Sequence, residues 1–500
     1  MQHGNPDVIV VGGGNAALCA ALSAREQGAR VLLLERAPHA ERGGNSVYTD
    51  GKMRFAYAGV DDIRALVPDL TEAEIGNSDF GVYSENDFFD DMARITQHRT
   101  DPDLCEILVR NSNAAVRWMK DNGVRFMPNF GRQAYKVDGR FKFWGGAPIV
   151  TWGGGVGLIE SLYRAAETKG IEVVYGAWVQ DLIHRDGTVS GVAARIDGVT
   201  RQIAARSVVL ACGGFEANTA WRTRYLGKGW DLAKVRGTRY NTGDGLDMSL
   251  RIGAQPYGHW SGCHAVGWER YATEFGDLVR TPAFQRHSYT FGIMVNGDGR
   301  RFLDEGADLR SFTYAKYGHI VLEQPGQFAW QIYDGKVLHL LLDEYRTKYV
   351  TKVRADTLEE LVRKLDDVDP VQCLATIREY NRAVKTDVAF DPNVKDGKCT
   401  VGLAMPKSNW AQTIDQPPFE AYAITCGVTF TFGGLRINAE AQVMNTNHEP
   451  IRGLYAAGEM VGGIFYFNYP GASGLTSGAV FGRLAGASAA RSALRLASAA

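Results

Sequence analysis

The sequence lacks paired cysteines, a strong net charge and long apolar runs, and each absence excludes a class of protein. Its seven cysteines are widely spaced and none form a C-x-x-C pair, so we predict reduced thiols and no metal site. The 55 Lys and Arg residues against 56 Asp and Glu residues give a net charge of -1, which offers no sign of a nucleic-acid or membrane-surface partner. Because no apolar run is long enough to span a membrane and no basic-then-apolar leader is visible, we expect a cytoplasmic protein without a membrane span.

Glycine is the most informative residue type that is present. The 58 glycines gather in short runs directly after apolar segments rather than in a repeat. That distribution indicates close approach of the backbone to a ligand. With 45% hydrophobic and 22% charged residues the composition is that of a globular protein, and 500 residues exceed what one core usually serves, so we expect two domains.

A strand–turn–helix pattern opens the chain. Residues 7–11 are an apolar run typical of a buried parallel strand, and three glycines at 12–14 follow it. Residues 15–27 then read as a helix with Ala and Leu on one face, and residues 30–34 read as a second buried strand that ends in Glu35. The order predicts a dinucleotide-binding unit.

Each part of this motif has a physical role in that unit. Gly12 permits the tight turn, and Gly14 lets a pyrophosphate reach the backbone at the positive end of the helix. Ala17 stands where a third glycine is usual and still allows the helix to pack closely on the strand. Glu35 can accept hydrogen bonds from an adenosine ribose.

Three further segments favour FAD over a nicotinamide cofactor. Residues 41–46, beyond the second strand, form a glycine-rich loop with small polar side chains that fits a flavin and its ribityl chain. Residues 207–215 and 453–459 are apolar strands that end in glycines, as do the strands flanking FAD in flavoproteins with two dinucleotide folds.

These motifs together resemble the fumarate reductase/succinate dehydrogenase flavoprotein family. The resemblance covers nearly the whole chain, and the run 301–310 is most similar to the family's FAD-dependent tricarballylate dehydrogenases. Besides the N-terminal fingerprint, the segments that carry it are 43–46, 211–215, 241–245, 295–305 and 433–486.

The resemblance implies an α/β fold with a discontinuous Rossmann-like FAD-binding domain and an inserted α+β cap, or substrate, domain. We expect the FAD-binding domain to comprise residues 1–256 and 430–500, with the cap at 257–429. Polar helical stretches at 357–365 and 370–385 in the middle of the chain agree with such a cap. The substrate would lie between cap and flavin, where closure excludes water.

The resemblance also implies the residues that bind the cofactor. Some members of the family hold FAD covalently through a histidine before the glycine pair, but His39 lies only four residues before Gly43, and we expect non-covalent FAD. The expected FAD-binding residues are Gly12, Gly14, Asn15, Ala16, Glu35, Arg36, Gly43, Gly44, Asn45, Ser46, Gly51, Val179, Ala211, Gly213, Asn241, Thr242, Asp244, Gly458, Glu459, Gly474, Leu475 and Thr476.

Arg310 is the expected proton-transferring residue. In soluble fumarate reductases an arginine shortly after the Arg-Phe-x-x-Glu run has this role, and Arg310 is the nearest match, displaced by one residue. An arginine is a poor acid in water, but in a dry site it can bind a substrate carboxylate and relay a proton. The sequence departs from the family's remaining substrate-site pattern at Phe430, Tyr469, Gln285 and Ser288, which speaks against simple fumarate reduction.

Two arrangements could replace the missing pattern. Arg286, His287 and Arg310 could supply cations for several carboxylates. Alternatively, Tyr469 and a backbone N–H could stabilise an enolate, as the Tyr-Pro-Gly run resembles flavin ketosteroid dehydrogenases. Glu305 reads as structural. The expected catalytic residues are thus Arg310, Tyr469 and Tyr314, with substrate contacts from His264, Arg286, His287, Phe430 and Asn468.

The predicted activity is desaturation of a C–C bond next to a carboxylate or carbonyl, with hydride passing to flavin N5. Alternatives are an enone-forming ketone desaturase, an ene-reductase of the fumarate reductase type, and a flavin-binding redox sensor or electron-transfer protein. We expect a small-molecule substrate and a separate electron acceptor, either an iron–sulfur or quinone-linked protein or oxygen.

Overall fold

The computed structural model describes residues 5–498, and its largest element is a nine-stranded sheet. Five parallel strands form its centre in the order β21-β13-β1-β2-β9, and β10, β11, β12 and β20 extend it on one side. The strands are β1 (Val8–Val11), β2 (Val31–Glu35), β9 (Glu172–Tyr175), β10 (Trp178–Arg185), β11 (Thr188–Ile196), β12 (Val199–Ala204), β13 (Ser207–Leu210), β20 (Gln442–Met444) and β21 (Pro450–Ala456). β1, β2 and β13 are buried along their whole length, as expected for continuous apolar runs.

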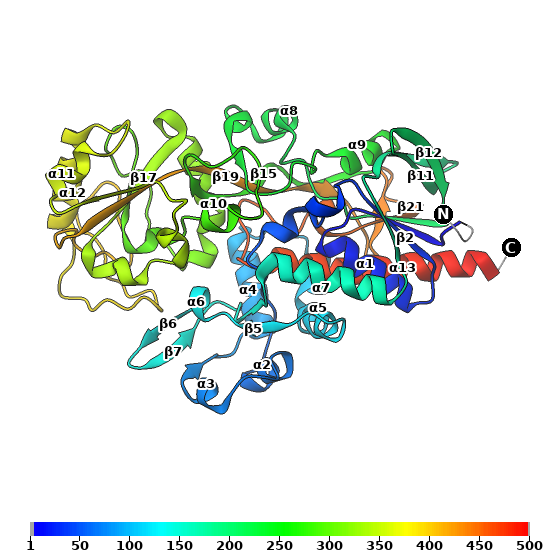
Figure 1. Cartoon of the computed structure of the whole chain (residues 1–500), viewed down its shortest axis with the longest axis horizontal. Coiled ribbons are helices and arrows are strands. Elements are labelled where there is room, and N and C mark those ends of the chain that lie inside the picture. The colour runs from blue at the N-terminus through cyan, green and yellow to red at the C-terminus, as the bar shows by residue number, and fades with distance from the viewer. Residues whose placement is uncertain (1–4, 499–500) are drawn as a thin grey trace.

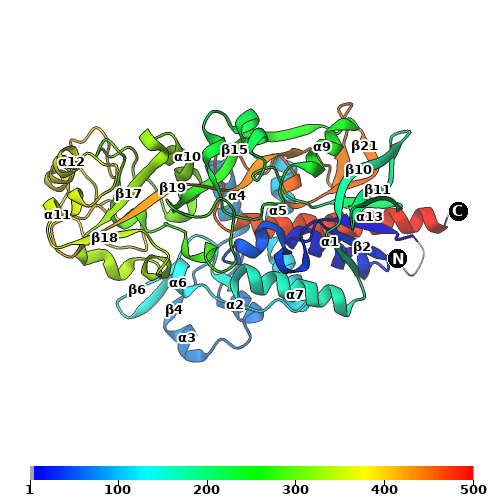
Figure 2. The same ribbon diagram turned by 45° about the horizontal axis from the view of Figure 1, so that its top comes forward.

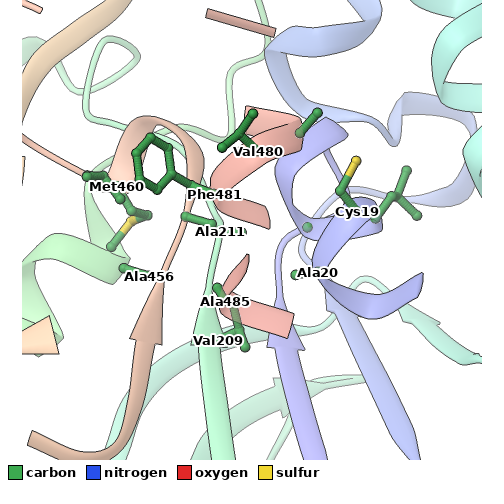
Figure 3. Close-up of a cluster of buried hydrophobic side chains, with 14 of the residues drawn as sticks. Cys19, Ala20, Val209, Ala211, Ala456, Met460, Val480, Phe481 and Ala485 are labelled. Carbon is green, nitrogen blue, oxygen red and sulfur yellow. The ribbon is translucent and has the colours of Figure 1, made fainter. Parts of the chain in front are cut away.

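Two helices from opposite ends of the chain cover this sheet together. α1 (Asn15–Glu26) packs along α13 (Ser473–Ser498), and Figure 1 shows both beside the strands, with the two termini at the same end of the molecule. Figure 3 shows Val480, Phe481 and Ala485 of α13 in one apolar cluster with side chains of α1, β13 and β21. The helices can approach closely because Gly486 has no side chain: a Cβ there would lie 2.1 Å from the Ala20 carbonyl oxygen. The C-terminal segment thereby completes the layer begun by the first helix.

A six-stranded sheet lies at the other end of the molecule. The 17-residue strand β19 (Phe419–Leu435) pairs with β14, β15, β17 and β18, and β16 joins through β17. Figures 1 and 2 show α11 and α12 at the outer end of this sheet. Its other elements are β14 (Lys234–Val235), β15 (Pro256–Glu269), β16 (Ile293–Val295), β17 (Phe328–Tyr333), β18 (Lys352–Ala355), α10 (Tyr314–Leu322), α11 (Leu358–Arg363) and α12 (Pro370–Ala383).

Smaller elements surround these two sheets, with α2, α3, β6 and β7 at the bottom of Figure 1 and α8 and α9 at its top. Two three-stranded sheets have the orders β3-β8-β5 and β4-β7-β6. The elements are β3 (Lys52–Met53), β4 (Ser78–Asp79), β5 (Phe126–Pro128), β6 (Ala134–Val137), β7 (Arg140–Phe143), β8 (Ile149–Thr151), α2 (Val60–Leu66), α3 (Glu72–Gly76), α4 (Glu85–Ile95), α5 (Pro102–Asp121), α6 (Phe130–Gln133), α7 (Gly154–Thr168), α8 (Thr219–Trp221) and α9 (Asp244–Arg251).

The α/β class is confirmed, and the parallel centre of the large sheet is of the Rossmann type. The division into residues 1–256, 257–429 and 430–500 stays a prediction. β19 runs across residues 429 and 430 without a break, so the second boundary falls inside a strand. Within residues 5–498, no helix is long and apolar enough to cross a membrane, and the cytoplasmic location also stays a prediction.

Candidate active site

One large cavity runs from the carboxyl ends of β1 and β2 to the six-stranded sheet. It is lined at one end by residues 11–16 and 34–36 and at the other by side chains from β15, β19 and α10. The carboxyl ends of parallel strands are where open α/β sheets bind their ligands. The cavity therefore extends from the nine-stranded sheet to the six-stranded sheet.

The turn after β1 leaves room only for backbone. Gly12 has a φ of +112°, and a Cβ there would lie 2.4 Å from the Ala211 carbonyl oxygen. Gly14 precedes α1 as its N-cap and makes no side-chain cap, and the first turn of the helix contains no acidic residue. The Asn15 N–H donates to the Ser46 hydroxyl over 3.1 Å, and the positive end of the helix remains available to a pyrophosphate.

Glu35 and Arg36 form the end of the cavity next to β2. The Ala37 N–H donates to the Glu35 carboxylate over 2.7 Å, while burial raises the pKa of Glu35 to about 7. The Arg36 guanidinium pairs with Asp244 at 2.5 Å and lies 4.8 Å from the centre of the Trp178 ring. The buried carboxyl group of Glu35 could bind the ribose of a dinucleotide, and the Trp178 ring with Arg36 beside it offers a flat surface for the adenine.

A buried polar network surrounds the middle of the cavity. Asn45 and Asn241 both donate to one oxygen of Glu216, over 2.5 Å and 2.7 Å. Glu459 accepts from the Thr431 N–H over 2.7 Å, and burial together with the neighbouring Glu216 carboxyl raises the pKa of Glu459 well above its usual range. Burial raises the pKa of Glu216 as well. A raised pKa favours the protonated form of a carboxyl group, which can donate as well as accept a hydrogen bond.

Aromatic side chains enclose the far end of the cavity. The His264 ring stacks on Phe430 at 5.2 Å and meets Tyr469 and Tyr314 edge-on at 4.8 Å and 5.1 Å. The Tyr314 and Tyr469 hydroxyls share a short hydrogen bond, and the Ala472 N–H lies 3.4 Å from the Tyr469 oxygen. Burial raises the pKa of both tyrosines, so both phenols stay protonated and can donate.

Positive side chains lie next to the tyrosines. A smaller cavity contains Arg310 and shares Lys52, His287, Tyr314 and Ala472 with the large one. Asp50 pairs with Lys52 at 3.3 Å and with Arg132 at 3.2 Å. Burial lowers the pKa of Lys52 to about 8. Arg310 is buried and donates to the Arg132 carbonyl. This end of the cavity therefore carries more cations than anions.

The structure brings most of the expected FAD residues together. The residues that line the large cavity are Gly12, Gly14, Asn15, Ala16, Glu35, Arg36, Gly44, Asn45, Ser46, Val179, Ala211, Gly213, Asn241, Thr242, Asp244, Gly458, Glu459, Gly474 and Leu475. Gly43, Gly51 and Thr476 lie behind them and do not line it. His39 does not line it either; it contacts Arg42 and the Tyr175 ring.

The expected substrate residues divide in the same way. His264, His287, Phe430, Tyr314 and Tyr469 line the large cavity. Arg286 lines neither cavity, because its guanidinium is bound to Glu269 at 2.7 Å and to two backbone carbonyls.

Asn468 also lies outside both cavities. It donates to the Phe312 carbonyl over 2.7 Å and accepts from the Tyr469 N–H, so it holds the segment that carries Tyr469. This geometry favours a supporting position for Asn468.

Sequence reasoning missed several cavity residues. Trp178 and Tyr240 flank Arg36, Asp50 and Lys52 follow the glycine-rich loop at 43–46, and Arg236 precedes the segment 241–245. Their nearness to recognised motifs was the only signal in the sequence. The sequence pattern around the charged residues among them does not distinguish them from charged residues on the surface.

Known proteins match this chain over nearly its whole length. A sequence model described as the FAD binding domain matches residues 7–475. The NADH:fumarate oxidoreductase of Klebsiella pneumoniae (strain 342) is 30% identical over 97% of this chain, which spans only 48% of that relative.

Two solved structures share the fold. The open conformation of a flavocytochrome c3 fumarate reductase has a TM-score of 0.73 at 26% identity, with 98% of this chain and 78% of that chain covered. The 3-ketosteroid delta1-dehydrogenase from Sterolibacterium denitrificans has a TM-score of 0.74 at 22% identity, with 97% and 99% covered. The first likeness adds to the family match, and the second shows the fold alone.

Proposed function

The chain belongs to the FAD binding domain family, with fumarate reductases and related flavoprotein oxidoreductases among its relatives, and on that premise we propose that it desaturates a C–C bond next to a carboxylate. The observation that carries this proposal is the positive, aromatic end of the FAD cavity, where Lys52 and Arg310 lie beside the Tyr314–Tyr469 pair. Anionic groups are the natural ligands of such a site. Tricarballylate is the substrate that we would test first.

The protein's own residues would bind and polarise the substrate. FAD supplies the hydride chemistry when bound. Arg310 and Lys52 would attract a carboxylate, and Arg310, after releasing its own proton to solvent, would take the proton from the carbon alpha to it. The protonated Tyr469, hydrogen-bonded to Tyr314, would donate to the oxygen on which negative charge develops. The buried aromatic wall of His264 and Phe430 would exclude water.

A ketone substrate is the second candidate. The Ala472 N–H donates to the Tyr469 oxygen, which orients the phenol, and the phenol can then donate its own proton to an enolate oxygen. The surplus of cations around Lys52 favours the carboxylate over the ketone, because a neutral ketone leaves those charges without a ligand.

Anaerobic mixing of the FAD-loaded protein with tricarballylate, citrate, succinate and cyclic ketones tests the two candidates. We expect tricarballylate to bleach the flavin absorbance near ~450 nm, because the cofactor itself takes the electrons. Bleaching by a ketone alone would contradict the proposal. If no compound bleaches it, dithionite-reduced protein is offered activated alkenes, and their reduction would assign the reverse direction to the same site. The electron acceptor stays a prediction.

Lys52 predicts a pH dependence. Because burial lowers the pKa of Lys52 to about 8, the free enzyme loses this cation as the pH rises through about 8. We expect kcat/KM for a polycarboxylate to fall about tenfold per pH unit above that value, since kcat/KM reports groups of the free enzyme. Lys52→Arg should keep the charge and remove the fall. The exposed Lys364→Arg serves as the control, and identical alkaline limbs in wild type and Lys52→Arg would rule out the role of Lys52.

A further inference from the structure

Arg236 is a buried arginine whose guanidinium has no hydrogen-bond acceptor and no ion-pair partner in the described part of the chain. It follows β14, and its backbone N–H donates to the Val428 carbonyl over 2.8 Å, which ties it to the central strand β19. The residue is 6% exposed and lines the large cavity. Its Nε makes no hydrogen bond, and no ion pair is found for the guanidinium within residues 5–498.

The other buried arginines all have acceptors. Arg54 pairs with Asp91 at 3.1 Å, and Arg286 pairs with Glu269 at 2.7 Å. Arg222 donates to three backbone carbonyls, and Arg310 donates to the Arg132 carbonyl. A buried charge without a counter-charge is costly, and proteins neutralise or pair such groups. The exception in Arg236 therefore indicates that its acceptor is a ligand.

The neighbours of Arg236 do not supply the missing charge. His264 has no hydrogen-bond partner on either ring nitrogen, and burial together with Arg236 lowers the pKa of His264 well below its usual range. Burial and the same guanidinium lower the pKa of His287. Asp50 is the nearby acid, but Lys52 and Arg132 already pair with it. The cavity thus presents a guanidinium beside two neutral imidazoles.

We propose that Arg236 binds one carboxylate of the substrate while Arg310 and Lys52 face a second, so that the substrate carries at least two carboxylates. The planar guanidinium matches a carboxylate in a bidentate manner, and the Trp268 ring, 5.6 Å from it, backs one face. The two cavities share Lys52, His287 and Tyr314, so one extended molecule can reach both anchors. This inference rests on the proposed function and adds the substrate class.

Equilibrium binding to the oxidised, FAD-loaded protein tests this inference without turnover. Malonate, tricarballylate and propionate are titrated while the flavin spectrum is followed. We expect Arg236→Gln to weaken binding of malonate and tricarballylate about 10- to 100-fold, the range for loss of a charge-assisted contact, and to leave propionate within about threefold. Arg236→Lys should retain part of the affinity, because it keeps the charge but not the fork. The neighbouring exposed Arg239→Gln is the matched control and should bind like wild type.

The outcomes separate the inference from the proposed function. Unchanged malonate and tricarballylate affinity in Arg236→Gln, or an equal loss for propionate, would overturn the inference. If Arg236→Gln fails to fold, Arg236→Lys is tested with malonate and with its monomethyl ester. Malonate should bind the variant more weakly than wild type, whereas the ester, which has one carboxylate, should bind both equally. Equal binding of malonate would overturn the inference. If wild type binds polycarboxylates through Arg236 but no carboxylate exchanges electrons with the flavin, the proposed function fails and the inference stands.

Discussion

Replacing Arg310 by Met is expected to lower kcat at least about 100-fold, because positioned proton transfer contributes about 10²–10⁴ to a rate. Arg310 lies at the start of a short 3-10 segment (Arg310–Phe312), is buried, and is held by the Arg132 carbonyl and the Trp144 ring at 5.7 Å. It faces the smaller cavity with Lys52 and Tyr314. The rate of flavin reduction by tricarballylate in a stopped-flow instrument measures the effect.

The pattern of kinetic losses tells proton transfer from simple anion binding. Loss of a proton-transferring group lowers kcat and kcat/KM together, whereas loss of uniform binding raises KM alone. Arg310→Lys keeps a cation and should recover binding but not the rate. Arg300→Met is the control, since Arg300 is exposed and its side chain donates to Gln372, away from both cavities. A kcat of Arg310→Met within threefold of wild type would remove Arg310 from the mechanism.

The FAD end of the cavity could be predicted from the sequence because its parts are local. Gly12, Gly14 and Glu35 belong to one strand–turn–helix–strand unit, and the steric reasons for each residue type act within that unit. The close turn at Gly12 and the buried Glu35 in the structure follow the same logic. Geometry of this kind can therefore be predicted from residues that are close together in the sequence.

The substrate end could not be predicted in this way, because it depends on which charges find partners. Arg286 and Arg236 are both buried arginines, and the sequence favoured Arg286 as the cation for the substrate. The structure pairs Glu269 with Arg286, whereas no acid among residues 5–498 forms an ion pair with Arg236. That difference arises from the pairing of β15 with β19 and from the position of β14, which no local pattern encodes.

The last helix shows how packing can reverse a local signal. Glycine is a poor helix former, yet α13 begins at Ser473 and contains several glycines in its first half. Gly478, Gly482 and Gly486 face α1, where backbone contact replaces the helix propensity that glycine lacks. Tertiary contact therefore decides the conformation of this segment.

Tyr469→Phe is expected to slow flavin reduction about 10²- to 10³-fold, the loss measured when one donor to a developing oxyanion is removed. The phenol is buried, stays protonated, and is aligned by Tyr314 and the Ala472 N–H, so little reorganisation is needed when charge develops on the substrate oxygen. FAD content should not change, because Phe keeps the aromatic contacts with His264 and Phe430.

Tyr314→Phe and the double variant test whether the two hydroxyls act as one unit. Residues joined by a hydrogen bond have non-additive effects, so the double variant should be only slightly slower than Tyr469→Phe alone. Tyr466→Phe, outside the cavity lining, is the matched control. Turnover of a ketone substrate should depend on Tyr469 and hardly on Arg310, whereas turnover of a carboxylate substrate should depend on both. The ratio of the rate losses in Tyr469→Phe and Arg310→Met therefore indicates which substrate oxygen the site polarises. Losses that multiply independently for Tyr314 and Tyr469 would contradict the paired donor and leave Tyr469 to act alone.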